Sequence, residues 1–267
     1  MPEIGAATRA LQAAMGARVA LVLCFTCLAC GAARSDPRAD AAAPPAAVAT
    51  WDDTVAEIAR ERARLAAAWR AADSATERAR VRDRASRYLV DAITTRLVPP
   101  WLGMPWGMGR DSTATRPHEN GKRISCSYFV GAILQGADFR LANRFRLGQA
   151  AALIIQHSLV GAPGKVHRYL SIPPADLAAR VRALGDGVYV IGLDVHVGLV
   201  VVRGDDVRFV HASYTGDQVV SDEPLADALA IARSQPRGYF VSPLVTAAGA
   251  ADDWLIERWL AGDEVGP

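Results

Sequence analysis

Cysteine is nearly absent from this chain beyond its first 30 residues. Four cysteines occur among the 267 residues, and only Cys126 lies after Cys30. A single cysteine has no intramolecular disulfide partner and cannot supply the Cys-x-x-Cys pair of a structural zinc site. The sequence therefore excludes a disulfide framework in this region. Cys126 is either a buried, inert residue or a reactive thiol.

Net charge is also nearly absent. The chain carries 30 basic and 28 acidic residues, which leave a formal charge of +2. Many of the basic residues are arginines spread along predicted helices, where they form solvated faces. A balanced charge gives no electrostatic reason for binding nucleic acid, so we expect no nucleic acid partner.

The apolar run near the N-terminus is short. It covers residues 19–30, too few to span a bilayer comfortably, and it follows Arg9 and Arg18. A short apolar run behind basic residues is typical of a signal peptide, so we predict one over residues 1–30. An internal hydrophobic helix is the alternative. The signal peptide implies that the protein is exported.

The end of this run indicates a membrane anchor. Residues 28–31 (LACG) resemble a bacterial lipobox, in which Cys30 would be acylated and become the mature N-terminus. Ordinary cleavage and release is the alternative. Residues 31–50 are rich in Ala, Pro, Asp and Arg, which predicts a flexible linker. We therefore expect a periplasmic protein, either free or attached to the outer membrane through a lipid on Cys30.

Hydrophobic periodicity predicts an α+β fold for the rest of the chain. Helical spacing is present at residues 51–97 with a break at 73–74, and again at 125–136, 140–160 and 176–184. Residues 108–124 lack periodicity and predict a loop. Branched and aromatic residues predict strands at 188–191, 195–202, 207–212 and 239–241, with a helix at 224–233. Helices followed by an antiparallel meander indicate an α+β layout.

Cys126 lies where one of these helices begins. Apolar helical spacing starts just after it, so the sulfur belongs to the first turn. The unpaired backbone N–H groups and the positive end of the helix dipole favour a thiolate there, and the same N–H groups can hold an oxyanion. Flanking serines and the polar loop before the helix argue against deep burial. The pattern favours a nucleophile.

Two histidines are expected on one face of a hairpin. Residues 203–206 (RGDD) form a good turn between two predicted strands. If Val202 pairs with Val207, period-two alternation places His196 and His211 on the same face, at the same end, as diagonal neighbours. A one-residue slip in the register would separate them. A thiol facing two such histidines satisfies the arrangement of nucleophile, base and orienting group.

These segments resemble the NlpC-type, papain-like cysteine peptidases that act on cell-wall peptides. In that family a Cys motif at a helix start precedes a Gly-Asp-leading strand, a His-Val-Gly strand and a strand ending in a third polar residue. The matching segments here are residues 125–130 (SCSYFV), 185–189 (GDGVY), 196–199 (HVGL) and 209–213 (FVHAS). Ser125 and Tyr128 stand where the family has Asp and Gly.

The resemblance implies a papain-like core over residues 99–267, in which the helix carrying the cysteine packs on an antiparallel sheet. The helical segment at 51–98 would precede this core. Cys126 would be the nucleophile, His196 the base and His211 the orienting residue. The implied reaction is hydrolysis of an amide bond through an acyl-enzyme, without a cofactor.

The resemblance also indicates the substrate and its groove. Peptidoglycan stem peptides are the expected substrate, in agreement with export. Ser127 and Tyr128, next to the nucleophile, would contact this substrate. Trp106 stands near the family's groove-lining aromatic and would do the same, although a plain core aromatic is the alternative.

Two other functions remain open on the sequence. Cys126, His196 and His211 could bind zinc as three ligands, although no Glu sits beside either histidine and we predict no metal. The altered cysteine motif also fits a non-catalytic binding lipoprotein on a degenerate enzyme fold. A groove blocked by Tyr128, or a thiol without a histidine in reach, would favour that second alternative.

Overall fold

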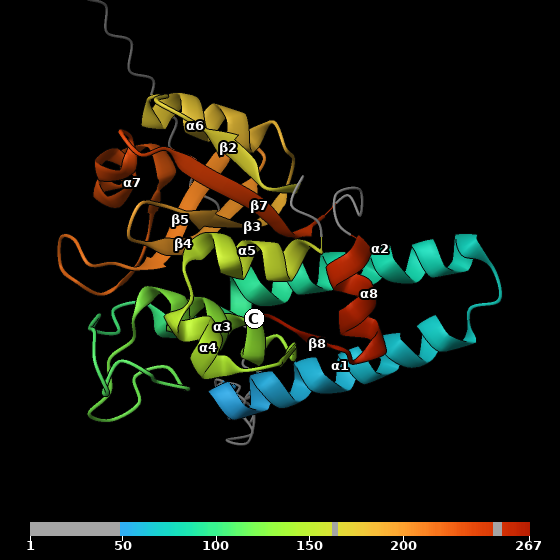
Figure 1. Ribbon diagram of the computed structural model, residues 1–267. Helices are drawn as coiled ribbons and strands as arrows, with labels where there is room; N and C mark the ends of the chain where they lie inside the picture. Colours follow the sequence, from blue (N-terminus) through green and yellow to red (C-terminus); the bar gives the residue numbers. More distant parts are fainter. Residues whose placement is uncertain (1–48, 162–164, 248–252) are drawn as a thin grey trace, which may run out of the picture. The chain divides into compact units, whose positions relative to one another are not determined.

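The computed structural model describes residues 49–161, 165–247 and 253–267 (Figure 1). The part of the chain from Ala47 onward forms one compact unit. The predicted signal peptide, Cys30 and nearly all of the predicted linker lie outside the described residues. Within the described residues, no helix is both long and apolar enough to cross a membrane.

Two capped helices begin the described chain. α1 (Trp51–Ala71) and α2 (Ala75–Asp91) each start with a capping box, formed by Thr50 with Asp53 and by Ser74 with Glu77. The predicted break at 73–74 is therefore confirmed. A π-helical turn, η1 (Ala92–Leu97), and a 3₁₀ turn, η2 (Pro99–Trp101), end this helical segment.

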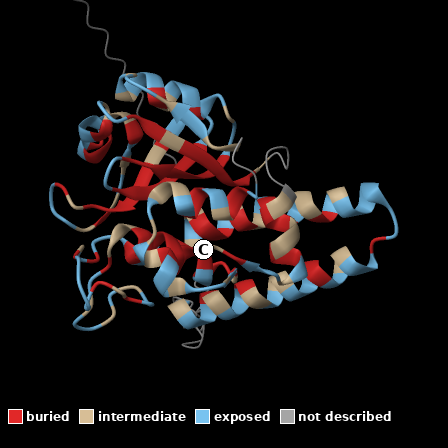
Figure 2. Cartoon of the chain, viewed as in Figure 1, coloured by how far each residue is buried: buried red, intermediate tan, exposed pale blue. Residues whose placement is uncertain are grey.

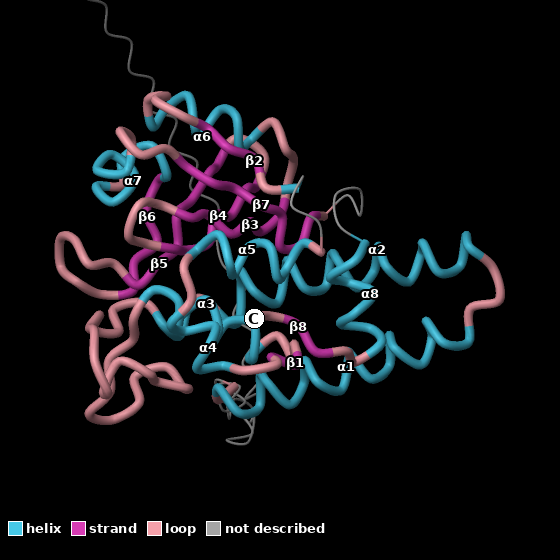
Figure 3. Tube along the Cα trace, viewed as in Figure 1, coloured by secondary structure: helices cyan, strands magenta, loops and turns pink. Residues whose placement is uncertain are grey.

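An antiparallel six-stranded sheet is combined with helices from separate parts of the chain, so the fold is α+β (Figure 3). Its order is β2-β7-β3-β4-β5-β6. The strands are β2 (His167–Tyr169), β3 (Gly187–Gly192), β4 (Val197–Arg203), β5 (Asp206–Ala212), β6 (Val220–Pro224) and β7 (Tyr239–Thr246). Strands β3 to β5 form the predicted meander, β6 continues it by pairing with β5, and β7 extends it on the other side by pairing with β3. A separate parallel pair joins β1 (Arg140–Leu141) to β8 (Glu264–Val265).

Both faces of this sheet are covered, and its central strands are buried (Figure 2). One face packs in a core with α3 (Cys126–Gly136), α5 (Ala152–Val160), α8 (Asp253–Ala261) and buried residues of α1 and α2. The other face packs against α6 (Pro174–Arg182), η4 (Leu225–Asp227) and α7 (Leu229–Ser234). The N-terminal helices thus share a core with the helix that carries Cys126.

The single helix predicted at 140–160 is wrong. The structure has β1, then α4 (Arg144–Gln149), an extended break at Ala150 and Ala151, and α5. The chain must turn because α4 packs against α3 whereas α5 packs against β3 and β7. Asn143 caps α4 by accepting a hydrogen bond from the backbone N–H of Arg146 at 2.9 Å.

The helix predicted at 224–233 begins too early. Residues Val220–Pro224 form strand β6, and only Leu229–Ser234 is α-helical, as α7. The chain is extended here because it pairs with β5 and gains backbone hydrogen bonds at the edge of the sheet. The local sequence does not reveal such pairing. Strand β2 and most of β7 were likewise not predicted.

Candidate active site

Cys126 is the first residue of α3, as predicted. Ser125 before it is extended and makes no side-chain cap. The approach is fixed by backbone bonds, with the Ser125 N–H donating to Ser112 O at 3.2 Å and the Ile124 N–H to Pro105 O at 3.0 Å. The thiol is free and half-buried. Because the first N–H groups of a helix have no intrahelical acceptor, they can donate to an anion beside the sulfur.

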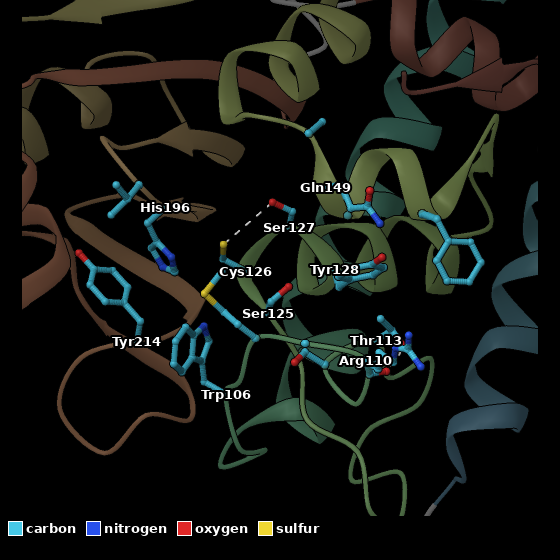
Figure 4. Close-up of a pocket in the computed structure, with 17 residues that line it drawn as sticks. Trp106, Arg110, Thr113, Ser125, Cys126, Ser127, Tyr128, Gln149, His196 and Tyr214 are labelled. Atoms are coloured by element: carbon cyan, nitrogen blue, oxygen red, sulfur yellow. Dashed lines mark hydrogen bonds between the residues drawn. The ribbon is translucent and has the colours of Figure 1, made fainter.

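His196 lies in the tight turn between β3 and β4. The strand predicted from residue 195 in fact begins at Val197. The Leu193 N–H donates to the His196 carbonyl at 2.8 Å, so residues 193–196 form the turn that precedes the strand. Asp194 and Val195 form the tip of this turn, and the Val195 side chain is 72% exposed. The His196 side chain is buried, and Figure 4 shows its ring directed toward Cys126.

His211, on β5, reaches His196 through the predicted hairpin register. Val202 pairs with Val207 across a turn that contains Gly204 with φ of 56°. The register brings the two rings together, with His196 Nε2 and His211 Nδ1 2.7 Å apart. The predicted contact between the histidines is confirmed. The expected orienting role of His211 stays a prediction.

Gly198 makes this close approach possible. A Cβ atom there would lie 2.6 Å from Phe209 Cε2 and 2.8 Å from His211 Cβ. The His211 ring stacks on Phe209, with centroids 3.9 Å apart and planes 17° apart. The glycine thus lets the two rings of β5 pack directly over β4.

Glu223 is a member of the site that the sequence did not reveal. It lies on β6, opposite Phe209 in the register, and its Oε1 is 2.8 Å from His211 Nε2. Its side chain is 34% exposed, whereas His211 is fully buried. The sequence pattern predicted a helix from residue 224, so it gave no strand here. The β-branched pair Val219 and Val220 is the local signal that could have indicated β6.

Burial sets the protonation of the two histidines. Loss of solvent lowers the pKa of His196 well below its ordinary value, and positive charge on His211 would lower it further. Burial also lowers the pKa of His211, although the hydrogen bond and the charge of Glu223 oppose this shift. Both imidazoles are therefore neutral at neutral pH, and a neutral His196 can accept a proton.

A cleft of about 930 Å³ opens beside the thiol (Figure 4). Its lining includes Cys126, His196 and all three predicted substrate-contacting residues, which are Trp106, Ser127 and Tyr128. Tyr214, which no sequence motif indicated, packs edge-on against His196 with ring centroids 5.1 Å apart. Trp106 lies beyond it, 6.4 Å from the Tyr214 ring. These three rings form an aromatic wall next to Cys126.

Tyr128 lines the cleft without closing it. Its ring packs against Gly148, where any Cβ would lie 2.4 Å from the ring, and Arg144 stacks over it at 5.1 Å. The Arg144 guanidinium also donates to the carbonyls of Thr113 and Ala114 at 2.7 and 2.6 Å. Arg144 thus ties α4 to the loop that precedes Cys126.

The histidines are not arranged as a pair of metal ligands. His196 Nε2 and His211 Nδ1 face each other at hydrogen-bond distance. Within the described ranges, no group of three or more His, Cys, Asp or Glu side chains could hold a metal ion.

No protein-family model matches this chain, and searches of curated proteins and of solved structures likewise found no match.

Proposed function

We propose that this chain is a cysteine hydrolase that cleaves an amide bond through an acyl-enzyme on Cys126. The observation that carries the proposal is a thiol at the start of a helix, in one cleft with a buried His196 that is hydrogen-bonded to His211. Nε2 of His196 is occupied by that bond, which leaves Nδ1 for the thiol. The packing of α3 against β4 and β5 supports a papain-like core.

The reaction follows from these groups. His196 Nδ1 takes the thiol proton as the sulfur bonds to the substrate carbonyl carbon. N–H groups at the start of α3 stabilise the oxyanion. The C–N bond then breaks, and His196 returns the proton to the leaving amine. Water, deprotonated by His196, attacks the thioester, and the C–S bond breaks to release the acid and restore Cys126.

Cell-wall peptides are the substrate class that we propose. The resemblance of the four sequence segments and the predicted export support this choice. A cleft of about 930 Å³ can hold several residues of a peptide. The location that fits this substrate is the periplasm, either free or as a lipoprotein anchored through Cys30.

The decisive test is the reactivity of the thiol. Alkylation of the full chain by iodoacetamide is followed across pH by mass spectrometry of the Cys126 peptide, because three other cysteines precede it. We expect rapid alkylation at pH 7, slowed at least about tenfold by His196→Ala. His167→Ala, at an exposed histidine on β2, is the matched control and should leave the rate unchanged.

Release of a free amine from peptidoglycan fragments then tests the substrate. A thiol that reacts no faster than free cysteine, or that is indifferent to His196→Ala, refutes the proposed nucleophile. A reactive thiol that leaves these fragments intact refutes only the substrate class.

A further inference from the structure

A continuous line of hydrogen bonds runs from Glu223 to the base. Glu223 Oε1 lies 2.8 Å from His211 Nε2, and His211 Nδ1 lies 2.7 Å from His196 Nε2. Every nitrogen of the two rings is thereby used except His196 Nδ1. In a neutral imidazole one nitrogen donates and the other accepts, so the position of each proton depends on its neighbour.

The carboxylate at the end of this line decides the direction of every bond. An ionised carboxylate only accepts hydrogen bonds, so His211 Nε2 must carry a proton. A neutral His211 then accepts at Nδ1, and His196 must donate from Nε2. His196 Nδ1 is left with a lone pair. The opposite tautomers would place an N–H at His196 Nδ1, which could not accept the thiol proton.

We propose that Glu223 is a positioning residue that fixes the tautomers of His211 and His196, so that His196 presents an unprotonated Nδ1 to Cys126. This inference deepens the proposed function and rests on it. Glu223 touches neither thiol nor substrate and acts only through His211. When His196 accepts the thiol proton, the same line places a negative charge behind the new imidazolium and stabilises it.

The surroundings of Glu223 leave its charge directed at His211. The neighbouring Asp222 lies on the opposite face of β6, because successive residues of a strand alternate. The Arg208 guanidinium donates to the Asp222 carboxylate at 2.8 Å. Asp222 therefore offers a matched control: it is one residue away, equally exposed at 34%, and outside the line of hydrogen bonds.

Nuclear magnetic resonance of the ring nitrogens reads the tautomers directly. The full chain is labelled with ¹⁵N-histidine, and the signals of His196 and His211 are assigned by single His→Gln substitutions. We expect both rings to carry the proton on Nε2. Glu223→Gln keeps the shape but can donate as well as accept, so it should populate protonated Nδ1 in both rings. Asp222→Asn should change neither.

The proposal is overturned if His196 carries its proton on Nδ1 in the unaltered protein. It is also overturned if Glu223→Gln leaves both tautomers unchanged. A merely structural role for Glu223 would alter stability but would not exchange the proton between ring nitrogens, so urea unfolding of each variant is measured alongside.

Thiol reactivity separates this inference from the proposed function. We expect Glu223→Gln to slow alkylation of Cys126 at least about tenfold, and Asp222→Asn to leave it within about twofold. If the unaltered thiol is unreactive, the proposed function fails while the nitrogen signals still test the tautomers. If the thiol is reactive and Glu223→Gln does not slow it, the positioning role fails and the nucleophile stands.

Discussion

Adding one methyl group at Gly198 should both destabilise the fold and disable the site. In Gly198→Ala the new Cβ would lie 2.6 Å from Phe209 Cε2, 2.8 Å from His211 Cβ and 3.1 Å from the Val210 carbonyl oxygen. Non-bonded carbon atoms prefer about 3.5–4.0 Å, so both side chains must retreat by roughly 0.7–1.4 Å. Overpacking of this kind costs about 1–3 kcal/mol of unfolding free energy.

The same displacement should break the contact between the histidines. His196 Nε2 and His211 Nδ1 are 2.7 Å apart, and a hydrogen bond weakens beyond about 3.2 Å. A shift of His211 away from β4 by about 0.7 Å would lengthen the distance between these two nitrogens beyond that limit. We therefore expect Gly198→Ala to slow alkylation of Cys126 as well as to lower the urea midpoint.

Gly136→Ala is the matched control. Its Cβ would lie 2.9 Å from Trp51 Cη2 and 3.0 Å from Leu97 Cδ2, a milder clash with the ends of two side chains, at the opposite end of α3 from the thiol. It should lower stability and leave alkylation of Cys126 unchanged. If Gly198→Ala retains both the stability and the thiol reactivity of the unaltered protein, the register argument for the site is refuted.

Three further changes test other parts of the structure. Because burial lowers the pKa of His196, the unfolded chain binds more protons than the folded chain below about pH 6.5. The unfolding free energy should therefore decrease as the pH is lowered below that value, by up to about 1.4 kcal/mol per pH unit for one proton. Urea midpoints should show this loss of stability, and His196→Gln should reduce it. Ser74→Ala removes the cap of α2 and should lower the unfolding free energy by about 0.5–2 kcal/mol, whereas a midpoint equal to that of the unaltered protein would contradict the cap. Arg144→Met removes the donor to two loop carbonyls and should expose residues 108–124 to limited proteolysis; an unchanged cleavage rate would show that Arg144 does not hold this loop.

Local sequence was enough to predict several parts of the site. The start of α3 follows from the onset of apolar periodicity after Ser125, which put Cys126 in the first turn. The shared face of His196 and His211 follows from period-two alternation and the Gly204 turn, because a two-residue hairpin fixes the register. Both features depend on interactions between residues close together in the chain.

Other elements could not be predicted because distant residues decide them. The break between α4 and α5 arises where one helix packs on α3 and the next on the sheet. The short strand β6 is stabilised by pairing with β5, which is not visible in its own sequence. The local pattern therefore predicts a helix from residue 224. Local propensity in each case was overruled by contacts far apart in the sequence.

By itself, the sequence indicated Cys126, His196 and His211 and the order in which they occur. It placed a lone thiol at a helix start and two histidines on one hairpin face. Only the tertiary structure brought the hairpin to the helix, added Tyr214 to the wall of the cleft, and set Glu223 2.8 Å behind His211. The physical reason is the sequence separation of the interacting residues. Backbone periodicity depends on residues a few positions apart, whereas the partner of a buried side chain depends on the packing of the whole domain.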